Sequence, residues 1–254
     1  MRLGSDPEVF LLNRNTGGYK SVIGLIGANK WNPAQIPGML DGFTLQEDNV
    51  ALEFGVPPAA TKEEFVKNIR SVLLAGLEKL PQTRFSRLSC VQFPESEMDN
   101  PSAWVFGCEP DYNAWTGLEN TKPQPPHPFL RSAGGHIHIE TSLDKRTVIK
   151  CIDLCAGVPS VLMDDGTERR KLYGNAGAFR PKPYGAEYRT LSKFWVFRPR
   201  LIEWAWDAVD LALQVAEHMP ELLEEIGDDV QACINNGDKK LAERLVKEFN
   251  LEVV

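Results

Sequence analysis

The order of strand-like and helical segments is the feature that most limits the folds open to this chain. Short apolar segments separated by Gly, Pro and Asn run from the N-terminus to about residue 195. After Pro199 the apolar spacing becomes helical, and it predicts helices at 199–218, 221–235 and 238–249. Strands that precede a block of helices are typical of an α+β fold with a mostly antiparallel sheet. We therefore expect a catalytic domain at 1–197 and a helical extension at 198–254 packed on it.

Capping residues, glycines and prolines mark where the individual elements begin and end. Thr61 and Glu64 form a capping box, which predicts a helix that continues to about Leu80. Pro57 and Pro58 are expected to end a strand at 49–55, and Gly157 to end a helix at 143–156. The other predicted elements are a hairpin of 7–12 and 19–26, a loop at 27–42, strands at 86–93 and 103–108, a proline-rich loop at 119–129, the strand RSAGGHIHIE, and a long loop at 166–185 before the strand GAEYRTLS.

Composition limits the partners and the compartment. The 254 residues carry a net charge of −7, which argues against general affinity for nucleic acid or for anionic membranes. No apolar run reaches the length of a membrane span, and the N-terminus lacks a basic segment followed by an apolar one. The 5 cysteines form no CxxC pair, so neither a zinc ribbon nor a disulfide framework is predicted. These features favour a cytoplasmic protein.

Several strand-like segments place chemically active side chains two positions apart. The pairs are Asp6 and Glu8 in SDPEVF, His136 and His138 in GGHIHIE, and Glu187 and Arg189 in GAEYRTLS. Because side chains alternate along a strand, each pair lies on one face of its strand. Adjacent buried carboxylates repel each other and lose hydration unless a cation offsets the cost. The alternatives are an exposed turn for the first pair, a structural role for the histidines and a surface ion pair for the third.

The segment QEDNVALEF supplies two further acids. Asp48 and Glu53 are five positions apart, so one regular strand would place them on opposite faces. Either a bulge or turn at Asp48–Asn49 brings them to one side, or only Glu53 faces the site. The candidate metal ligands are Asp6, Glu8, Asp48, Glu53, His136 and Glu187. An oxygen-rich set with one or two imidazoles favours Mg²⁺ or Mn²⁺ over structural zinc.

A cluster of basic residues precedes the strand that carries Glu187. It consists of Arg169, Arg170, Lys171, Arg180 and Lys182, in a segment punctuated by glycine. Such a cluster suits a polyphosphate whose charge is shared between metals and arginines, and the alternative is a solvated charged loop. No GxxxxGK[ST] motif is present, so metals and side chains would have to hold the phosphates.

In this order, the motifs resemble those of the glutamine synthetase and glutamate–cysteine ligase superfamily. Asp6-Pro7-Glu8 is similar to its first E-x-E strand, ALEF to a later strand ending in glutamate, GGHIHI to its HxH strand and Glu187-Tyr188-Arg189 to its ExR strand. The resemblance covers roughly residues 1–197 and, within the superfamily, indicates the phage and bacterial carboxylate–amine ligases, or type 2 amidoligases. It implies a glutamine-synthetase-like catalytic domain, in the host cytoplasm if a phage encodes the chain.

The resemblance also implies the reaction and the role of each motif. The expected activity is an ATP- and Mg²⁺-dependent (or Mn²⁺-dependent) ligase that joins an acid to an amine through an acyl phosphate, leaving ADP and phosphate. One metal would be held by Glu8, Glu53 and either Asp48 or Glu47, and the metal on the γ-phosphate by Asp6, His136 and Glu187. The nucleotide would be bound by His138, Arg169, Arg170, Arg180 and Arg189, and the expected catalytic residues are Arg180, Glu187 and Arg189.

Two rival functions remain open at the level of sequence. One is a metal-dependent hydrolase that uses the HxH motif and the carboxylates. The other is a non-catalytic phage protein with a degenerate site. The acid and amine substrates could be small molecules or peptides. Candidate substrate contacts are Cys108, Asp111, Tyr112, Asn113 and the loop at 121–128, for which a structural corner is the alternative.

Overall fold

The structure is a computed structural model that describes residues 1–104 and 110–254. The strands are β1 (Arg2–Ser5), β2 (Glu8–Val9), β3 (Leu11–Asn13), β4 (Tyr19–Lys20), β5 (Ala34–Gln35), β6 (Thr44–Asp48), β7 (Ala51–Ala59), β8 (Thr83–Phe85), β9 (Cys90–Gln92), β10 (Tyr112–Asn113), β11 (Leu130–Ser132), β12 (Ile137–Glu140), β13 (Ala178–Lys182) and β14 (Gly185–Tyr188). The α-helices are α1 (Lys62–Lys79), α2 (Lys145–Ile152), α3 (Val158–Met163), α4 (Thr167–Leu172), α5 (Pro199–His218), α6 (Leu222–Asn236) and α7 (Lys239–Glu248). A π-helix, η3 (Asp153–Gly157), joins α2 to α3, and short 3-10 helices occur at η1 (Glu95–Glu97), η2 (Pro101–Trp104) and η4 (Lys193–Phe197).

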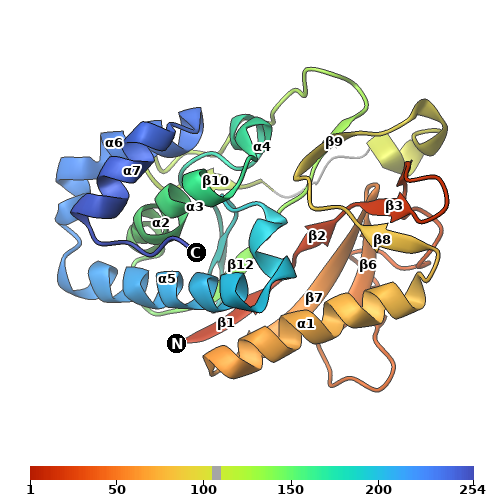
Figure 1. Cartoon of the computed structure of the whole chain (residues 1–254). Coiled ribbons are helices and arrows are strands. Elements are labelled where there is room, and N and C mark those ends of the chain that lie inside the picture. The colour runs from red at the N-terminus through yellow and green to blue at the C-terminus, as the bar shows by residue number, and fades with distance from the viewer. Residues whose placement is uncertain (105–109) are drawn as a thin grey trace.

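A nine-stranded sheet organises the molecule. Its strand order is β10-β13-β14-β12-β1-β7-β6-β5, with β2 paired to β7. The strand pairs within the described ranges are antiparallel. Helix α1 packs against β7, α2 packs against β13 and β14, and the C-terminal helices gather beside α2 and α3 at one side of the molecule (Figure 1). The prediction of an α+β fold with a mostly antiparallel sheet and a helical C-terminus is confirmed.

The buried hydrophobic residues form two clusters. The larger one contains Ile137 and Ile139 of β12, whose side chains are fully buried, together with residues of α1, α2 and α5. The smaller one contains Phe10, Val50 and Phe93 and packs beneath the β9–β11 pair. Helix α5 contacts both α1 and α2, so the C-terminal helices share the larger cluster. The division of the chain at residue 197 stays a prediction.

Helix boundaries agree with those predicted from capping residues and apolar spacing for α1, α5, α6 and α7. The Thr61 hydroxyl accepts a hydrogen bond from the Glu64 amide, and the Glu64 carboxylate accepts one from the Ala60 amide, which confirms the capping box at the start of α1. Helices α5, α6 and α7 begin and end within about two residues of the predicted bounds. The hairpin around NRNTGG is present as β3 and β4, but its second strand ends at Lys20 and not at 26, and β2 pairs with β7 instead. The segment 27–42 is a loop apart from β5.

The prediction that Pro57 and Pro58 end the strand is wrong. Strand β7 continues through both prolines to Ala59 and pairs with β6, a strand that was not predicted. Proline lacks the N–H that a regular ladder needs. The pairing of β7 with β1 changes register between Leu3 and Ser5, so the prolines lie where that ladder is already irregular.

The prediction that Gly157 ends a helix is also wrong. The helical run continues from α2 through the π-helix η3 into α3, and the φ of Gly157 is −59°, within the right-handed helical region. A Cβ at Gly157 would lie 2.6 Å from Ile234 Cδ1 and 2.9 Å from the Tyr188 hydroxyl. Glycine is needed here for close packing, not to end a helix.

The segment 166–185 is not a long loop. It contains helix α4 and strand β13, which pairs with β14. The expected strand at 86–93 is shorter and appears as β9, with β8 just before its predicted start. Residues 103 and 104 belong to η2, and the rest of the strand expected at 103–108, including Cys108, lies outside the described residues.

In the part of the chain that the structure describes, no helix is both long and apolar enough to cross a membrane. Cys90, Cys151, Cys155 and Cys233 are free thiols there.

Candidate functional site

The β6–β7 hairpin brings Asp48 and Glu53 to one face of the sheet. The chain turns at Asn49, which has a φ of 55°, and Gln46 of β6 then lies directly opposite Glu53 of β7. Side chains opposite each other on paired strands share a face, and Asp48 is two positions from Gln46. The turn that the sequence left as an alternative therefore exists, and both acids line the same cavity.

The register also separates Asp48 from Glu47. Glu47 lies opposite Leu52, on the other face of the hairpin. Its carboxylate accepts hydrogen bonds from the amides of Gly24 at 3.0 Å, Ile26 at 2.8 Å and Gly27 at 2.8 Å, and so orders the loop that follows β4. Of the two acids proposed as the upstream ligand, the structure brings only Asp48 to the cavity.

The other half of the sheet presents the second group of ligands. His138 of β12 lies opposite Glu187 of β14, and Arg180 of β13 lies opposite Glu187 from the other side. Asp6 follows β1, the neighbour of β12, and His136 immediately precedes β12. With Ile137 and Ile139 in the core, the alternation along β12 directs both histidines away from it.

Apart from Glu47 and His138, these charged residues line one cavity of about 380 Å³. Its charged lining contains Asp6, Glu8, Asp48, Glu53, His136, Glu187, Arg169, Arg180, Lys182 and Arg189. The walls include Glu119, Asn120, Lys122, Pro123 and Pro125 of the proline-rich segment, part of which was predicted as a candidate substrate contact. The structure thus brings together residues from both ends of the predicted catalytic domain.

Glu187 is the centre of the cationic half of the cavity. It is fully buried and contacts Arg189, Arg180 at 3.7 Å and Lys182 at 2.9 Å. Burial and the nearby Asp6 would raise the pKa of Glu187, but Arg189 and the two histidines outweigh them and lower this pKa to about 2. Glu187 is therefore ionised across the physiological pH range.

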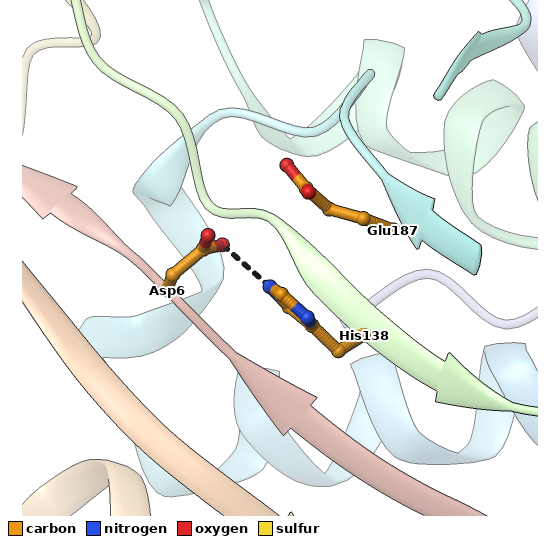
Figure 2. Close-up of side chains that lie close together, drawn as sticks. All are labelled: Asp6, His138 and Glu187. Carbon is orange, nitrogen blue, oxygen red and sulfur yellow. Dashed lines mark ion pairs between the residues drawn. The ribbon is translucent and has the colours of Figure 1, made fainter. Parts of the chain in front are cut away.

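Asp6 contacts both imidazoles, and Figure 2 shows its carboxylate beside the ring of His138. Its Oδ1 atom is 3.1 Å from His138 Nε2 and 3.3 Å from His136 Nδ1. Burial raises the pKa of Asp6, but His138 and His136 outweigh it and hold that pKa well below its usual range. Asp6, His138 and Glu187 each offer a ligand atom within 4.8 Å of the others, so His138, which was expected to approach nucleotide phosphate, is also placed to bind a metal.

The carboxylates of Glu8, Asp48 and Glu53 form the anionic half of the cavity. Glu53 accepts a hydrogen bond from Gln46 at 2.8 Å, and Glu8 accepts one from the Gly134 amide at 2.6 Å. Burial, together with the charges of Asp6, Asp48 and Glu8, raises the pKa of Glu53 well above its usual value. Burial and the charge of Glu8 raise the pKa of Asp48 to about 6. Mutual repulsion of this kind is relieved when a divalent cation binds, so the donor set fits Mg²⁺ or Mn²⁺.

We expect that Glu53→Gln stabilises the metal-free protein at neutral pH. A carboxyl group whose pKa is raised by folding contributes almost no penalty below pH 4.5, its unfolded value; the penalty grows as the pH rises from there to the folded pKa and is constant above it. The unfolding midpoint in EDTA should therefore rise by a few degrees at pH 8 and stay unchanged at pH 4.5. Glu47→Gln is the control, since it removes an acid of the same hairpin from outside the cavity. A lower midpoint for Glu53→Gln at pH 8 would show that Glu53 is structural.

Adjacent arginines of α4 have different environments. Arg169 lines the cavity and donates to the Ser132 hydroxyl at 3.1 Å and to the Arg189 carbonyl at 2.8 Å. Arg170 instead donates to the Ser160 carbonyl at 3.2 Å and lies 3.8 Å from the Asp164 carboxylate. Arg170 does not line the cavity, so the structure does not bring it to the predicted nucleotide site.

Several residues of the site were missed by sequence reasoning. Gln46 stands two positions before Asp48, so the same spacing rule could have found it. Trp31 is 79% exposed and lines the cavity beside Lys30, whose ammonium lies 4.7 Å from the centre of the indole ring. The Tyr184 hydroxyl hydrogen-bonds His138 Nδ1, a contact between the β13–β14 turn and β12 that no local pattern indicates. Asp111, named before only as a substrate contact, lies 3.7 Å from Arg189 Nε.

Comparison with known proteins identifies the family. A family model described as Phage phiEco32-like COOH.NH2 ligase-type 2 matches residues 125–254, just over half of the chain. The chain belongs to this family. No curated protein and no solved structure matches it.

The matched region includes both histidines, Glu187, Arg189 and the C-terminal helices. The resemblance found in the sequence covered residues 1–197, and the family model shares only residues 125–197 with it. The family model also includes the C-terminal helices, which the resemblance did not. The suspected type 2 ligase family is confirmed, and the glutamine-synthetase-like identity of the fold stays a prediction.

Proposed function

We propose that the protein is an ATP-dependent and Mg²⁺-dependent carboxylate–amine ligase that forms an amide through an acyl phosphate. The family name supports a ligase that joins a carboxylate to an amine. The observation that carries the finer proposal is the single cavity in which the carboxylates of β2, β6 and β7 face the basic side chains around Glu187. A hydrolase or a non-catalytic module gives no role to this basic group.

Each half of the cavity has its own task in this proposal. Glu8, Asp48 and Glu53 would hold one divalent ion, and Asp6 and Glu187, with His136 or His138, would hold another. Bound there, the ions would neutralise negative charge on the nucleotide and on the acid. Arg180, Lys182 and Arg189 would bind the γ-phosphoryl group, on which charge accumulates as the substrate carboxylate attacks.

The proposed reaction has two steps. The carboxylate oxygen of the acid forms a bond to the γ-phosphorus of ATP, and the bond from that phosphorus to the bridging oxygen breaks, which releases ADP. The amine nitrogen then attacks the acyl carbon, phosphate leaves, and the amine gives up a proton. Amide and phosphate form together. The enzyme contributes mainly position and electrostatics to both steps.

We expect ATP consumption to yield ADP and phosphate in step with the amide. The test incubates the protein with Mg²⁺, ATP and a panel of carboxylic acids, with hydroxylamine as the amine. Nucleotide products are measured by chromatography, and hydroxamates by mass spectrometry. Hydroxamate should form only with the complete mixture, and EDTA should abolish it.

A variant with Glu187→Gln serves as the inactive control, because it keeps the size of the buried side chain and removes the charge. AMP and pyrophosphate as products would contradict the acyl phosphate. Full activity in the presence of EDTA would contradict the requirement for divalent ions.

A further inference from the structure

Asp153 is a buried carboxylate outside the cavity that binds several segments at once. It begins the π-helix η3 and is fully buried. Its Oδ2 atom accepts hydrogen bonds from Trp115 Nε1 at 2.7 Å and from the Gly177 amide at 2.6 Å. Its Oδ1 atom accepts one from the Tyr188 hydroxyl at 2.8 Å and lies 3.3 Å from the Thr190 hydroxyl, which also donates to the Asn175 carbonyl at 3.0 Å.

The donors of Asp153 are all uncharged. Among the residues that the structure describes, no cation lies within ion-pair distance of it. Burial outweighs the hydrogen bonds from Trp115 and Tyr188 and raises the pKa of Asp153 to about 7. Burying a carboxylate here costs free energy, but only a carboxylate offers two acceptor oxygens to donors on both sides. An asparagine would have one oxygen and a donating amide group.

The donors connect Asp153 to the segments that carry the cationic half of the cavity. Tyr188 and Thr190 alternate with Glu187 and Arg189, so they occupy the opposite face of the same extended segment. Gly177 immediately precedes β13, which carries Arg180. Trp115 follows β10 on the segment that carries Asp111, the acid 3.7 Å from Arg189 Nε.

The π-helix makes this contact possible. Gly157 is the last residue of η3, and any Cβ there would lie 2.9 Å from the Tyr188 hydroxyl. The widened turn and the missing side chain let the tyrosine hydroxyl reach Asp153 inside the helical layer. π-Helical turns inside α-helices are often found at functional sites.

We propose that Asp153 is a positioning residue that fixes Glu187 and Arg189 at the cavity by holding the opposite face of β14 and the segments on either side of it. Its effect on turnover rests on the proposed ligase function. Its effect on the order of β14 does not.

The test compares Asp153→Asn with Leu245→Ala. Leu245 is buried in α7, which packs on α3 and α6, so its truncation destabilises the helical layer without removing a hydrogen bond to β13 or β14. Backbone hydrogen exchange is measured for 185–190 in both variants without substrate. We expect exchange of these amides to accelerate at least about tenfold in Asp153→Asn relative to Leu245→Ala. Equal exchange in the two variants would overturn the proposal whether or not the protein is a ligase.

The kinetic arm uses temperatures well below both unfolding midpoints. Asp153→Asn should lower kcat roughly 10- to 100-fold with little change in the KM for ATP, because misplacement of Arg189 acts on the transferred group. In an Arg189→Ala background the same substitution should lower kcat less than twofold, whereas a purely structural role predicts additive losses.

Tyr188→Phe is the second variant, used in case Asp153→Asn does not fold. It removes one hydrogen-bond donor and leaves the Asp153 carboxylate in place, and it should lower kcat by a smaller factor than Asp153→Asn. Additive losses, or Tyr188→Phe with unchanged kcat, would overturn the proposal. Absence of turnover in the unmodified protein would instead refute the ligase function.

Discussion

Arg189→Ala is expected to slow turnover by roughly three orders of magnitude, the size of effect seen when an arginine that stabilises phosphoryl transfer is lost. Arg189 contacts Glu187 in the cavity and lies beside Asp111. In the proposed reaction its guanidinium interacts most strongly with charge that develops as the γ-phosphoryl group moves. ATP affinity should therefore fall much less than kcat. Steady-state kinetics and calorimetric ATP binding in the presence of Mg²⁺ measure the two effects separately.

Arg170→Ala is the matched control for this prediction. Arg170 is also a buried arginine, but it contacts Ser160 and Asp164 away from the cavity. Its loss should lower the unfolding midpoint and leave kcat within a fewfold of the original. If Arg170→Ala and Arg189→Ala slow turnover equally, Arg189 acts only through stability, and the assignment to phosphoryl transfer fails.

Asp48→Asn is expected to weaken Mg²⁺ binding at least about tenfold and to abolish most Mg²⁺-dependent turnover, since affinity for a hard divalent cation depends on the number of charged oxygen ligands. Asp48 lines the cavity, and burial and the charge of Glu8 raise its pKa to about 6. Below that pH, part of the protein carries a proton on Asp48, and Mg²⁺ must displace this proton to bind. Titration calorimetry in two buffers at pH 5.5 and pH 8 should show proton release that is smaller at the higher pH.

The neighbouring acid supplies the control for Asp48. Glu47→Gln changes an adjacent side chain that faces away from the cavity and orders the loop at 24–27. It should lower stability and leave Mg²⁺ affinity unchanged. Weaker Mg²⁺ binding in Glu47→Gln than in Asp48→Asn would reverse the assignment of the upstream ligand.

The two-residue spacing of polar side chains was the most informative pattern in the sequence. Alternation on a strand is a local property, so it correctly placed His136 with His138 on one side, opposite the buried Ile137 and Ile139. It could not show that His138 lies opposite Glu187, because register between strands distant in sequence depends on the whole sheet. For the same reason the contact between Tyr184 and His138 had no signal in the sequence.

Errors arose where glycine and proline had a tertiary role. Gly157 lies inside a helical run because Tyr188 and Ile234 approach its backbone, and no local pattern reports that contact. Pro57 and Pro58 remain in β7 where the ladder with β1 is irregular. The segment at 166–185 is rich in charge and glycine, which favoured a loop, and only the packing of α4 distinguishes Arg169 from Arg170.

The separation of the hydrophobic residues into a larger and a smaller cluster has a consequence for engineering. The smaller cluster supplies Phe10, Val50 and Ala51 to the wall of the cavity, beside the proline-rich segment. The larger cluster supports the strands that present Glu187 and the histidines. Under the proposed function, substrate preference can therefore be varied in libraries confined to 119–130, because Val50 and Ala51 adjoin the proposed ligands Asp48 and Glu53. Strands β12 and β14, which carry the histidines and Glu187, would keep their support in the larger cluster.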